Sequence, residues 1–421
     1  MRSSASRLVI LVALAACTGG EPSGPGAGGE LVAVDPPAAP GALAPHLAAD
    51  GDGALLSWLE PVAAAGADAA APQHRLRVAR FDGRRWGEAG TVHAGPGFFA
   101  NWADTPSVVV EADGRWLAHW LERLGDGTYA YGVRLAWSDD RGAGWSPPVW
   151  LHDDASATEH GFVSLVPGAG GALAVWLDGR AMAAGGAMSL RAGAAGEAPL
   201  AGQVLDDRVC ECCATAAVAT PDWALVAYRD RSEDEVRDIA LVRGDALGWS
   251  EPYALAADGW RIPGCPVNGP ALSASGHRVA AAWFTAAGGG PRVRAALSED
   301  GGASFGAPVE VAAAGAVGRV GVALEPEGSA LVGWIGALAG EAAGTGAPRG
   351  AVWLRRIAPG GAAGAPLPVA ATSTARASGF PRLLVRGDEA WLAWVETGAP
   401  ARLRFGRLPR SAVPGAPGAG R

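Results

Sequence analysis

The sequence predicts an all-β fold, a β-propeller of seven four-stranded blades, on the basis of a repeat and of the strands inside it. A short apolar segment built around an aromatic residue returns every 51 to 62 residues along the chain. This period is typical of propellers and solenoids, because one unit cannot bury its apolar faces alone and must stack on its neighbours. The recurring aromatic residues are Trp58, Trp120, Trp176, Tyr228, Trp283, Trp334 and Trp394.

Each unit contains four short segments of strand-forming residues, separated by turns rich in glycine. In the second unit we expect strands at 106–112, 116–122, 131–138 and 147–152. Four strands in a repeated unit are the blade of a propeller.

The two ends of the chain predict how the ring closes. The last unit stops after residues 402–408 and lacks a fourth strand, whereas residues 29–35 form an apolar segment before the first unit. We expect this N-terminal strand to complete the seventh blade, because its pairing would remove an exposed sheet edge. A six-bladed ring is the alternative if one degenerate unit does not form a blade.

The N-terminus predicts export. Residues 1–16 combine two arginines with an apolar run too short to span a bilayer, which is typical of a signal peptide. The run ends in LAAC at Cys17, which resembles a bacterial lipobox and implies cleavage before Cys17 and lipidation of its side chain. By resemblance to lipoproteins of two-membrane bacteria, Thr18 favours the outer membrane. We therefore expect an envelope protein that is attached to a membrane through its N-terminal lipid.

Composition predicts the remaining segment boundaries of the chain and the classes of binding partner that are disfavoured. Residues 17–30 are rich in Gly, Pro, Ser and Thr and predict a flexible tether, residues 31–409 hold the repeats, and residues 410–421 predict a disordered tail. The net charge of −8, with every basic residue an arginine, argues against nucleic acid or an anionic membrane surface as a partner.

Two turns share the polar pattern S-x-D-x-G-x-x-W/F. The pattern resembles the Asp-box, or BNR repeat, of sialidases and related propellers, in which the Ser and Asp side chains accept hydrogen bonds from turn amides. The resemblance implies a structural role at the third turn of a blade and no part in catalysis. The matching residues are Ser138, Asp140, Gly142 and Trp145 in the second unit, and Ser298, Asp300, Gly302 and Phe305 in the fifth.

Propeller topology is expected to gather the unusual residues of this Ala- and Gly-rich chain at one end of the ring. The connections between blades lie on the same face as the connections between strands two and three of each blade, and propeller sites usually lie there. For a glycan or another small molecule, the candidate binding residues are His160, Arg180, Arg229, Asn268, Arg319 and Arg376.

The four cysteines that follow Cys17 fall in the same kind of connection. Cys210 and Cys265 each precede the recurring aromatic residue of their unit by 18 residues, so they occupy matching positions on adjacent blades. One interpretation is two disulfides, as suits an oxidising compartment, although a bond between the neighbours Cys212 and Cys213 would be strained. The other interpretation is a thiolate site for Cu(I) or Zn(II), with His160 nearby.

The resemblance to sialidases also implies an activity. It implies three arginines on the sugar carboxylate, a tyrosine nucleophile paired with a glutamate, and an aspartate acid/base, for which the candidates are Asp104, Asp178 and Asp230. None of the four tyrosines lies in the last units, where the family has its nucleophile. Our hypothesis is therefore a ligand-binding lipoprotein that is not a standard sialidase. A sialidase-like glycoside hydrolase is the first alternative, and a cysteine-based copper or metal-binding envelope protein is the second.

Overall fold

A computed structural model describes residues 30–62, 73–168, 170–338 and 349–417. The predicted signal peptide, Cys17 and the tether up to residue 29 lie outside these residues. Within them, no helix is long and apolar enough to cross a membrane. The helical segments are single 3-10 turns, η1 (Met182–Ala184), η2 (Ala287–Gly289), η3 (Arg376–Ser378) and η4 (Arg410–Ala412).

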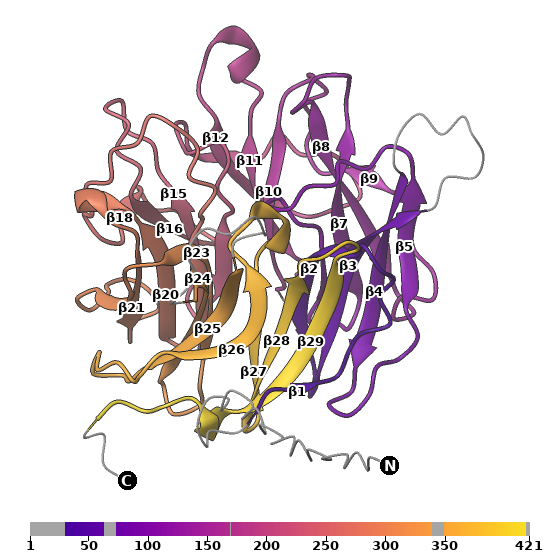
Figure 1. Cartoon of the computed structure of the whole chain (residues 1–421). Coiled ribbons are helices and arrows are strands. Elements are labelled where there is room, and N and C mark those ends of the chain that lie inside the picture. The colour runs from indigo at the N-terminus through magenta and orange to yellow at the C-terminus, as the bar shows by residue number, and fades with distance from the viewer. Residues whose placement is uncertain (1–29, 63–72, 169, 339–348, 418–421) are drawn as a thin grey trace, which may run out of the picture.

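The strands form seven antiparallel sheets that stand in a ring around a central axis (Figure 1). In the first six sheets the strands are ordered in space as they are in the chain, so each repeat unit is one blade. The first three blades consist of β2 (Leu43–Asp50), β3 (Gly53–Val62), β4 (Gln73–Phe81), β5 (Gly90–Gly95), β6 (Ser107–Val110), β7 (Trp116–Arg123), β8 (Tyr131–Ser138), β9 (Val149–Trp150), β10 (His160–Val166), β11 (Leu173–Asp178), β12 (Ser189–Ala194) and β13 (Gln203–Asp206).

The last four blades follow the same order. They consist of β14 (Ala216–Ala219), β15 (Ala224–Arg229), β16 (Ile239–Asp245), β17 (Gly248–Trp249), β18 (Tyr253–Ala254), β19 (Ala271–Ser275), β20 (Arg278–Thr285), β21 (Arg292–Ser298), β22 (Val309–Ala312), β23 (Ala316–Leu324), β24 (Ala330–Ala337), β25 (Arg349–Ile357), β26 (Leu367–Ser373), β27 (Arg382–Arg386), β28 (Glu389–Glu396), β29 (Arg402–Pro409) and β1 (Val32–Ala33). In blade four the outermost strand is split, since both β17 and β18 pair with β16.

The N-terminal strand closes the ring. Strand β1 pairs antiparallel with β29, with Val32 opposite Arg407 and Ala33 opposite Gly406. Figure 1 shows the indigo start of the described chain beside its yellow end. The prediction of seven blades, with the last one completed by the N-terminal strand, is therefore confirmed, and the six-bladed alternative is excluded.

The second strand of each blade is buried on both faces between neighbouring blades, which explains its nearly continuous apolar sequence. Eight consecutive residues of β3 are buried. Trp58 of this strand packs with Phe81 of its own blade and with Trp391 and Phe405 of blade seven. Burial of such a ring stabilises the fold by about 2 to 3 kcal/mol, so the recurring aromatic residues act in packing between blades.

The segment after β29 differs from its prediction. Residues 410–412 form η4, and Val413 is fully buried. Arg356 donates hydrogen bonds from its guanidinium to the carbonyl oxygens of Arg410 and Val413, at 2.7 and 2.6 Å. The prediction of a disordered tail that begins at residue 410 is therefore wrong for residues 410–413, because a side chain from blade six satisfies their backbone.

The two turns with the S-x-D-x-G pattern are closed by their own side chains. Ser138 Oγ accepts a hydrogen bond from the amide of Gly142 at 2.8 Å, and Asp140 Oδ1 accepts one from the amide of Gly144 at 2.8 Å. Gly142 has a φ of 87°, a backbone conformation that favours glycine. The turn at Ser298 and Asp300 repeats these bonds. Phe305 packs between blades four and five, and Trp145 packs between blades one and two.

Candidate functional site

A hollow of about 590 Å³ lies where the connections at one end of the ring meet. We call this end the mouth face and the opposite end, which carries the two polar turns, the far face. Ala103 and Phe162 border both the hollow and a smaller cavity of about 240 Å³ between the innermost strands, so the hollow covers the end of the central channel. The aromatic, charged and sulfur-containing residues around it include Trp102, Glu159, Glu211, Cys212, Cys265 and Arg376.

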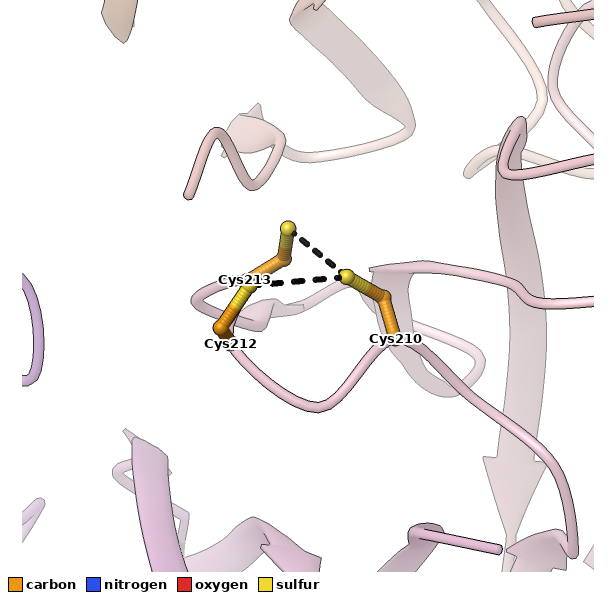
Figure 2. A group of neighbouring side chains, drawn as sticks. All are labelled: Cys210, Cys212 and Cys213. Carbon is orange, nitrogen blue, oxygen red and sulfur yellow. Dashed lines mark hydrogen bonds between the residues drawn. The ribbon is translucent and has the colours of Figure 1, made fainter. Parts of the chain in front are cut away.

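Three cysteines form a cluster (Figure 2), and one of them, Cys212, borders the hollow. Cys210 Sγ lies 3.0 Å from Cys213 Sγ and 3.9 Å from Cys212 Sγ, and all three sulfur atoms lie within 4.8 Å of one another. Cys210 and Cys213 are buried, whereas Cys212 and Cys265 border the hollow. All four are free thiols, so the predicted disulfides stay a prediction.

The connection between β15 and β16 holds the two cysteine segments side by side. On one side Val209 pairs with Asp230, and the amide of Cys210 donates to the carbonyl of Arg229 at 3.0 Å. On the other side Val236 pairs with Arg261, in the segment that leads to Cys265. The local chain therefore continues the sheet beyond β15 on both sides and brings the thiols of two blades to one wall.

Guanidinium groups lie against the sulfur cluster. Arg237 Nη1 donates to Glu211 Oε2 at 2.8 Å and lies 3.4 Å from Cys210 Sγ. Arg231 forms an ion pair with Glu211 as well. Both carboxylate oxygens of Glu211 are therefore engaged by arginines, which leaves the sulfur atoms as the free donors of this wall.

The pKa values of the four thiols are shifted in different directions. Contacts with the sulfur atoms of Cys212, Cys213 and Cys265 lower the pKa of Cys210 far below its usual range. Contacts with Cys210, Cys213 and Cys265 raise the pKa of Cys212, and the contact with Cys210 raises the pKa of Cys265 to about 12. Burial raises the pKa of Cys213. The cluster therefore holds negative charge on Cys210 first.

A phenol and two carboxyl groups lie beside the hollow. Tyr131 Oη is 2.6 Å from Glu159 Oε1 and 3.1 Å from Asp104 Oδ2, which also accepts a hydrogen bond from the amide of Phe162 at 2.9 Å. Burial raises the pKa of Asp104 to about 8 and that of Glu159 to about 7. Asp104 and Tyr131 are fully enclosed, and only Glu159 reaches the hollow.

Three of the predicted ligand-binding residues are bound to the protein itself. Arg229 is 2% exposed, and its guanidinium donates to the carbonyl oxygens of Asn268, Arg237 and Phe284 at 2.5 to 2.9 Å. Arg319 donates to the carbonyl of Ala375 at 2.7 Å. Asn268 accepts a hydrogen bond from the amide of Arg319 at 2.7 Å. These side chains connect neighbouring blades beneath the hollow.

The predicted residues of blade three form a separate group that does not border the hollow. Asp178 is fully buried and accepts hydrogen bonds from Trp176 at 2.9 Å and from Arg180 at 2.7 Å. Burial opposes ionisation of Asp178, but these bonds outweigh it and lower the pKa to about 2. His160 is buried and stacks on His152 with ring centroids 4.0 Å apart. It therefore lies away from the thiols that it was expected to accompany.

Asp230 and Arg376 have different surroundings. Asp230 Oδ1 accepts a hydrogen bond from the amide of Arg231, and burial raises the pKa of Asp230 to about 6. Arg376 borders the hollow with its guanidinium 6.0 Å from the ring of Trp102, whose ring also lies 4.9 Å from the guanidinium of Arg319. No carboxylate among the described residues forms an ion pair with Arg376 or Arg319.

The sequence analysis missed several residues of this site. Trp102, Glu159, Glu211 and Arg237 all belong to connections that were singled out for other residues. Glu211 stands between two of the clustered cysteines, and Glu159 directly precedes His160. Their position next to selected residues was a usable signal. Tyr131 had none, because it begins a strand with an ordinary apolar sequence.

Comparison with known proteins gives the fold alone. No protein-family model matches the chain, and no curated protein matches it. Among solved structures, a protein of unknown function from Dyadobacter fermentans DSM 18053 is similar with a TM-score of 0.52 and 15% identity, over 90% of this chain and 98% of that chain.

Carbohydrate-active propellers are also among the similar structures. A leech intramolecular trans-sialidase has a TM-score of 0.47 and 11% identity, over 89% of this chain and 68% of that chain. An α-L-arabinanase from Penicillium chrysogenum has a TM-score of 0.48 and 11% identity, over 92% of this chain and 99% of that chain. Identities this low carry no residue roles to this chain.

Proposed function

We propose that this chain is an exported, lipid-anchored propeller that binds a small anionic ligand, such as an acidic sugar, in the hollow at its mouth face, and that it is not a standard sialidase. The observation that carries the proposal is the wall formed by Trp102 and Arg376. An aromatic face beside a guanidinium without a carboxylate partner suits a ligand that combines an apolar face with a carboxylate.

The surroundings of this wall add to its preference for an anion. Arg319 lies on the same tryptophan, and burial followed by the charge of Arg376 lowers the pKa of Arg319 to about 10. Arg319 therefore still carries its positive charge at neutral pH. An anion that binds beside the two guanidinium groups reduces the repulsion between them. The two S-x-D-x-G turns support the Asp-box resemblance, which concerns the fold and not the ligand.

A specific observation favours the glycoside hydrolase as a second candidate, because Tyr131 and Glu159 form a hydrogen-bonded pair close to Asp104. These are the residue types that a sialidase uses. Tyr131 is 0% exposed, however, and burial raises its pKa well above the usual range, so its oxygen is neither accessible nor ready to ionise. The arginines Arg229 and Arg319 are bound to carbonyl oxygens beneath the hollow and are poorly placed to clamp a substrate.

The topology is compatible with a lipid at Cys17. Strand β1 is the fourth strand of its blade and runs from the far face toward the mouth face, so the chain enters the ring at the far face. A tether attached there would leave the hollow directed away from the membrane. Cys17→Ala is expected to move the protein from the membrane fraction to the soluble fraction of the envelope.

The ligand proposal is tested by calorimetric titration of the mature chain with N-acetylneuraminic acid and with glucuronic acid. We expect binding of at least one probe and a loss of about tenfold or more in affinity on Arg376→Ala, since one charge-assisted contact is worth roughly 1.5 to 3 kcal/mol. Arg84→Ala, in an exposed turn of the far face, is the matched control and should bind as the unchanged protein does.

The same preparation is incubated with a fluorogenic sialoside. We expect no turnover. Turnover that is lost on Glu159→Gln would favour the glycoside hydrolase, and the absence of binding by both acidic sugars would contradict the proposed ligand class.

A further inference from the structure

We propose that the thiolates of Cys210, Cys212 and Cys213 form a trigonal Cu(I) site in the wall of the hollow, with Cys265 of the adjacent blade as the exposed sulfur through which the ion enters and leaves. This inference rests on the proposed function only because both place a binding site at the mouth face. The metal site uses other residues of the hollow, so it can hold or fail independently of acidic-sugar binding.

The donor set selects a soft ion. Thiolate sulfur favours Cu(I) and Zn(II) over hard cations that prefer oxygen. The nearest carboxylate is Glu211, and its two oxygens are engaged by Arg231 and Arg237. His160 lies in another cluster, beside Asp154 at 3.0 Å. Among the described residues, the sulfur atoms are therefore the metal donors that this part of the wall leaves free.

The number of sulfur atoms within reach distinguishes the two soft ions. A structural Zn(II) site requires four ligands in a tetrahedron. Among the described residues only the sulfur atoms of Cys210, Cys212 and Cys213 all lie within 4.8 Å of one another, whereas Cys265 contacts Cys210 and Cys212 without being close to all three. The distance of 3.9 Å between Cys210 Sγ and Cys212 Sγ is close to the separation of about 4 Å expected for two sulfurs on one ion at a metal–sulfur distance of about 2.3 Å.

Charge around the cluster favours the deprotonated state that a metal needs. Arg237 is 3% exposed, and its Nη1 lies 3.4 Å from Cys210 Sγ. This buried guanidinium group reduces the cost of placing anionic sulfur away from water.

Access follows from the exposure of the four sulfurs. Cys210 and Cys213 are each 1% exposed, Cys212 borders the hollow, and Cys265 is exposed on the same wall. An ion that arrives in the hollow can bind Cys265 and Cys212 first and then exchange Cys265 for the buried sulfurs. The close approach of Cys210 and Cys213, 3.0 Å between sulfurs, must open slightly for this.

Oxidation is the competing fate of the same thiols. Closing Cys210 and Cys213 to a disulfide would remove two electrons and two protons and would leave too few thiolates for a trigonal site. The test therefore uses the mature chain, reduced and kept free of oxygen, and titrates it with Cu(I) held by a chromophoric chelator. We expect one Cu(I) per chain, and X-ray absorption should show three sulfur ligands and no oxygen or nitrogen.

Matched serine variants separate the ligands from the entry sulfur. Cys212→Ser and Cys213→Ser should each weaken Cu(I) binding at least about a hundredfold, more than is usual for a residue outside the coordination sphere. Cys265→Ser should keep the stoichiometry and the affinity within about tenfold and should slow Cu(I) uptake. Thermal unfolding of each variant without copper checks that the fold is intact, and if Cys213→Ser does not fold, the more exposed Cys212→Ser decides alone.

Several results would overturn the site. They are the absence of Cu(I) uptake by the reduced chain, equal affinity after Cys212→Ser, or preferred binding of Zn(II) by four sulfurs including Cys265. Arg376→Ala should bind Cu(I) normally while it loses the acidic sugar, so failure of the metal site is distinguishable from failure of the proposed function.

Discussion

The far face and the mouth face of the ring use polar side chains in opposite ways. On the far face, Ser298 and Asp300 find their partners within six residues, as when Asp300 Oδ1 accepts the amide of Ser304 at 2.9 Å. On the mouth face, Arg229 of blade four binds the carbonyl of Phe284 in blade five, 55 residues away. Polar side chains at the far face find hydrogen-bond partners within their own turn, whereas those at the mouth face find them in neighbouring blades.

The difference shows where this fold holds unusual chemistry. The local turns lower the pKa of their aspartates, Asp140 and Asp300. For Asp300, burial opposes ionisation, but the hydrogen bonds from Ser304 and Ser298 outweigh it and lower the pKa to about 2. At the mouth face, Asp104 keeps a raised pKa, and its Oδ1 has no hydrogen-bond partner. Asp104, which has a partner in another blade, is thus less completely satisfied than the aspartates of the local turns.

The largest expected effect comes from breaking a contact between blades. Arg229→Met should lower the free energy of unfolding by about 3 kcal/mol or more, because it leaves three buried carbonyl groups without their donor. Denaturant unfolding followed by tryptophan fluorescence measures this. The exposed Arg376→Met is the control and should stay within about 0.5 kcal/mol, and equal effects of the two variants would contradict the role of Arg229 in holding neighbouring blades together.

A pH dependence of stability is the next largest effect. The pKa of Asp104 is raised in the fold from 3.8 to about 8, so the folded chain keeps a proton that the unfolded chain loses above about pH 4. Stability should therefore fall as pH rises from about 4 to 8, by on the order of 1 kcal/mol per pH unit, and should not change further through this group above 8. Asp104→Asn cannot ionise at this position and should make the slope smaller, while Glu159, whose pKa is raised to about 7, keeps a contribution of the same sign.

For Asp178 we expect the opposite change, a stability that falls as pH is lowered, and the same unfolding measurement tests it. Its folded pKa is lowered to about 2, so its contribution to stability is complete above about pH 4 and is lost as pH falls through 2. Asp178→Asn should leave the slope between pH 5 and 8 unchanged. Equal slopes for the unchanged protein and Asp104→Asn over that range would sink the interpretation of Asp104.

The smallest effect should come from the far face. Asp300→Ala removes hydrogen bonds from an exposed turn, and water replaces most of what they contribute, so we expect a loss of roughly 1 kcal/mol. Thermal unfolding measures it. Binding of acidic sugar and of Cu(I) should not change, since the turn lies at the other end of the ring, and a loss of either would contradict the separation of the two faces.

Several features were predictable from particular residues. Trp58 and its six counterparts gave the blade count, because interblade packing demands a bulky apolar residue at the same point of each unit. The apolar segment at 29–35 predicted the closing strand. The cysteines and Arg376 could be assigned to the mouth face from the sequence because topology assigns each type of connection to one face, whereas their role in a site stays a prediction.

The roles of Arg229, Arg319 and Asn268 could not be read in the same way. Nothing in the sequence distinguishes an arginine that binds a ligand from one that binds the carbonyl of the next blade. The pairing of Tyr131 with Glu159, and the engagement of Glu211 by two arginines, likewise depend on the distances between blades.

The sequence by itself determined the period, the strands and the polar turns, since each depends on residues that are near one another in the chain. Only the tertiary structure decided which thiols meet, which arginines face solvent and which carboxyl group is enclosed. The physical reason is that hydrogen bonding, burial and charge act over a few ångströms in space, and at the mouth of this ring those few ångströms join residues from different repeats.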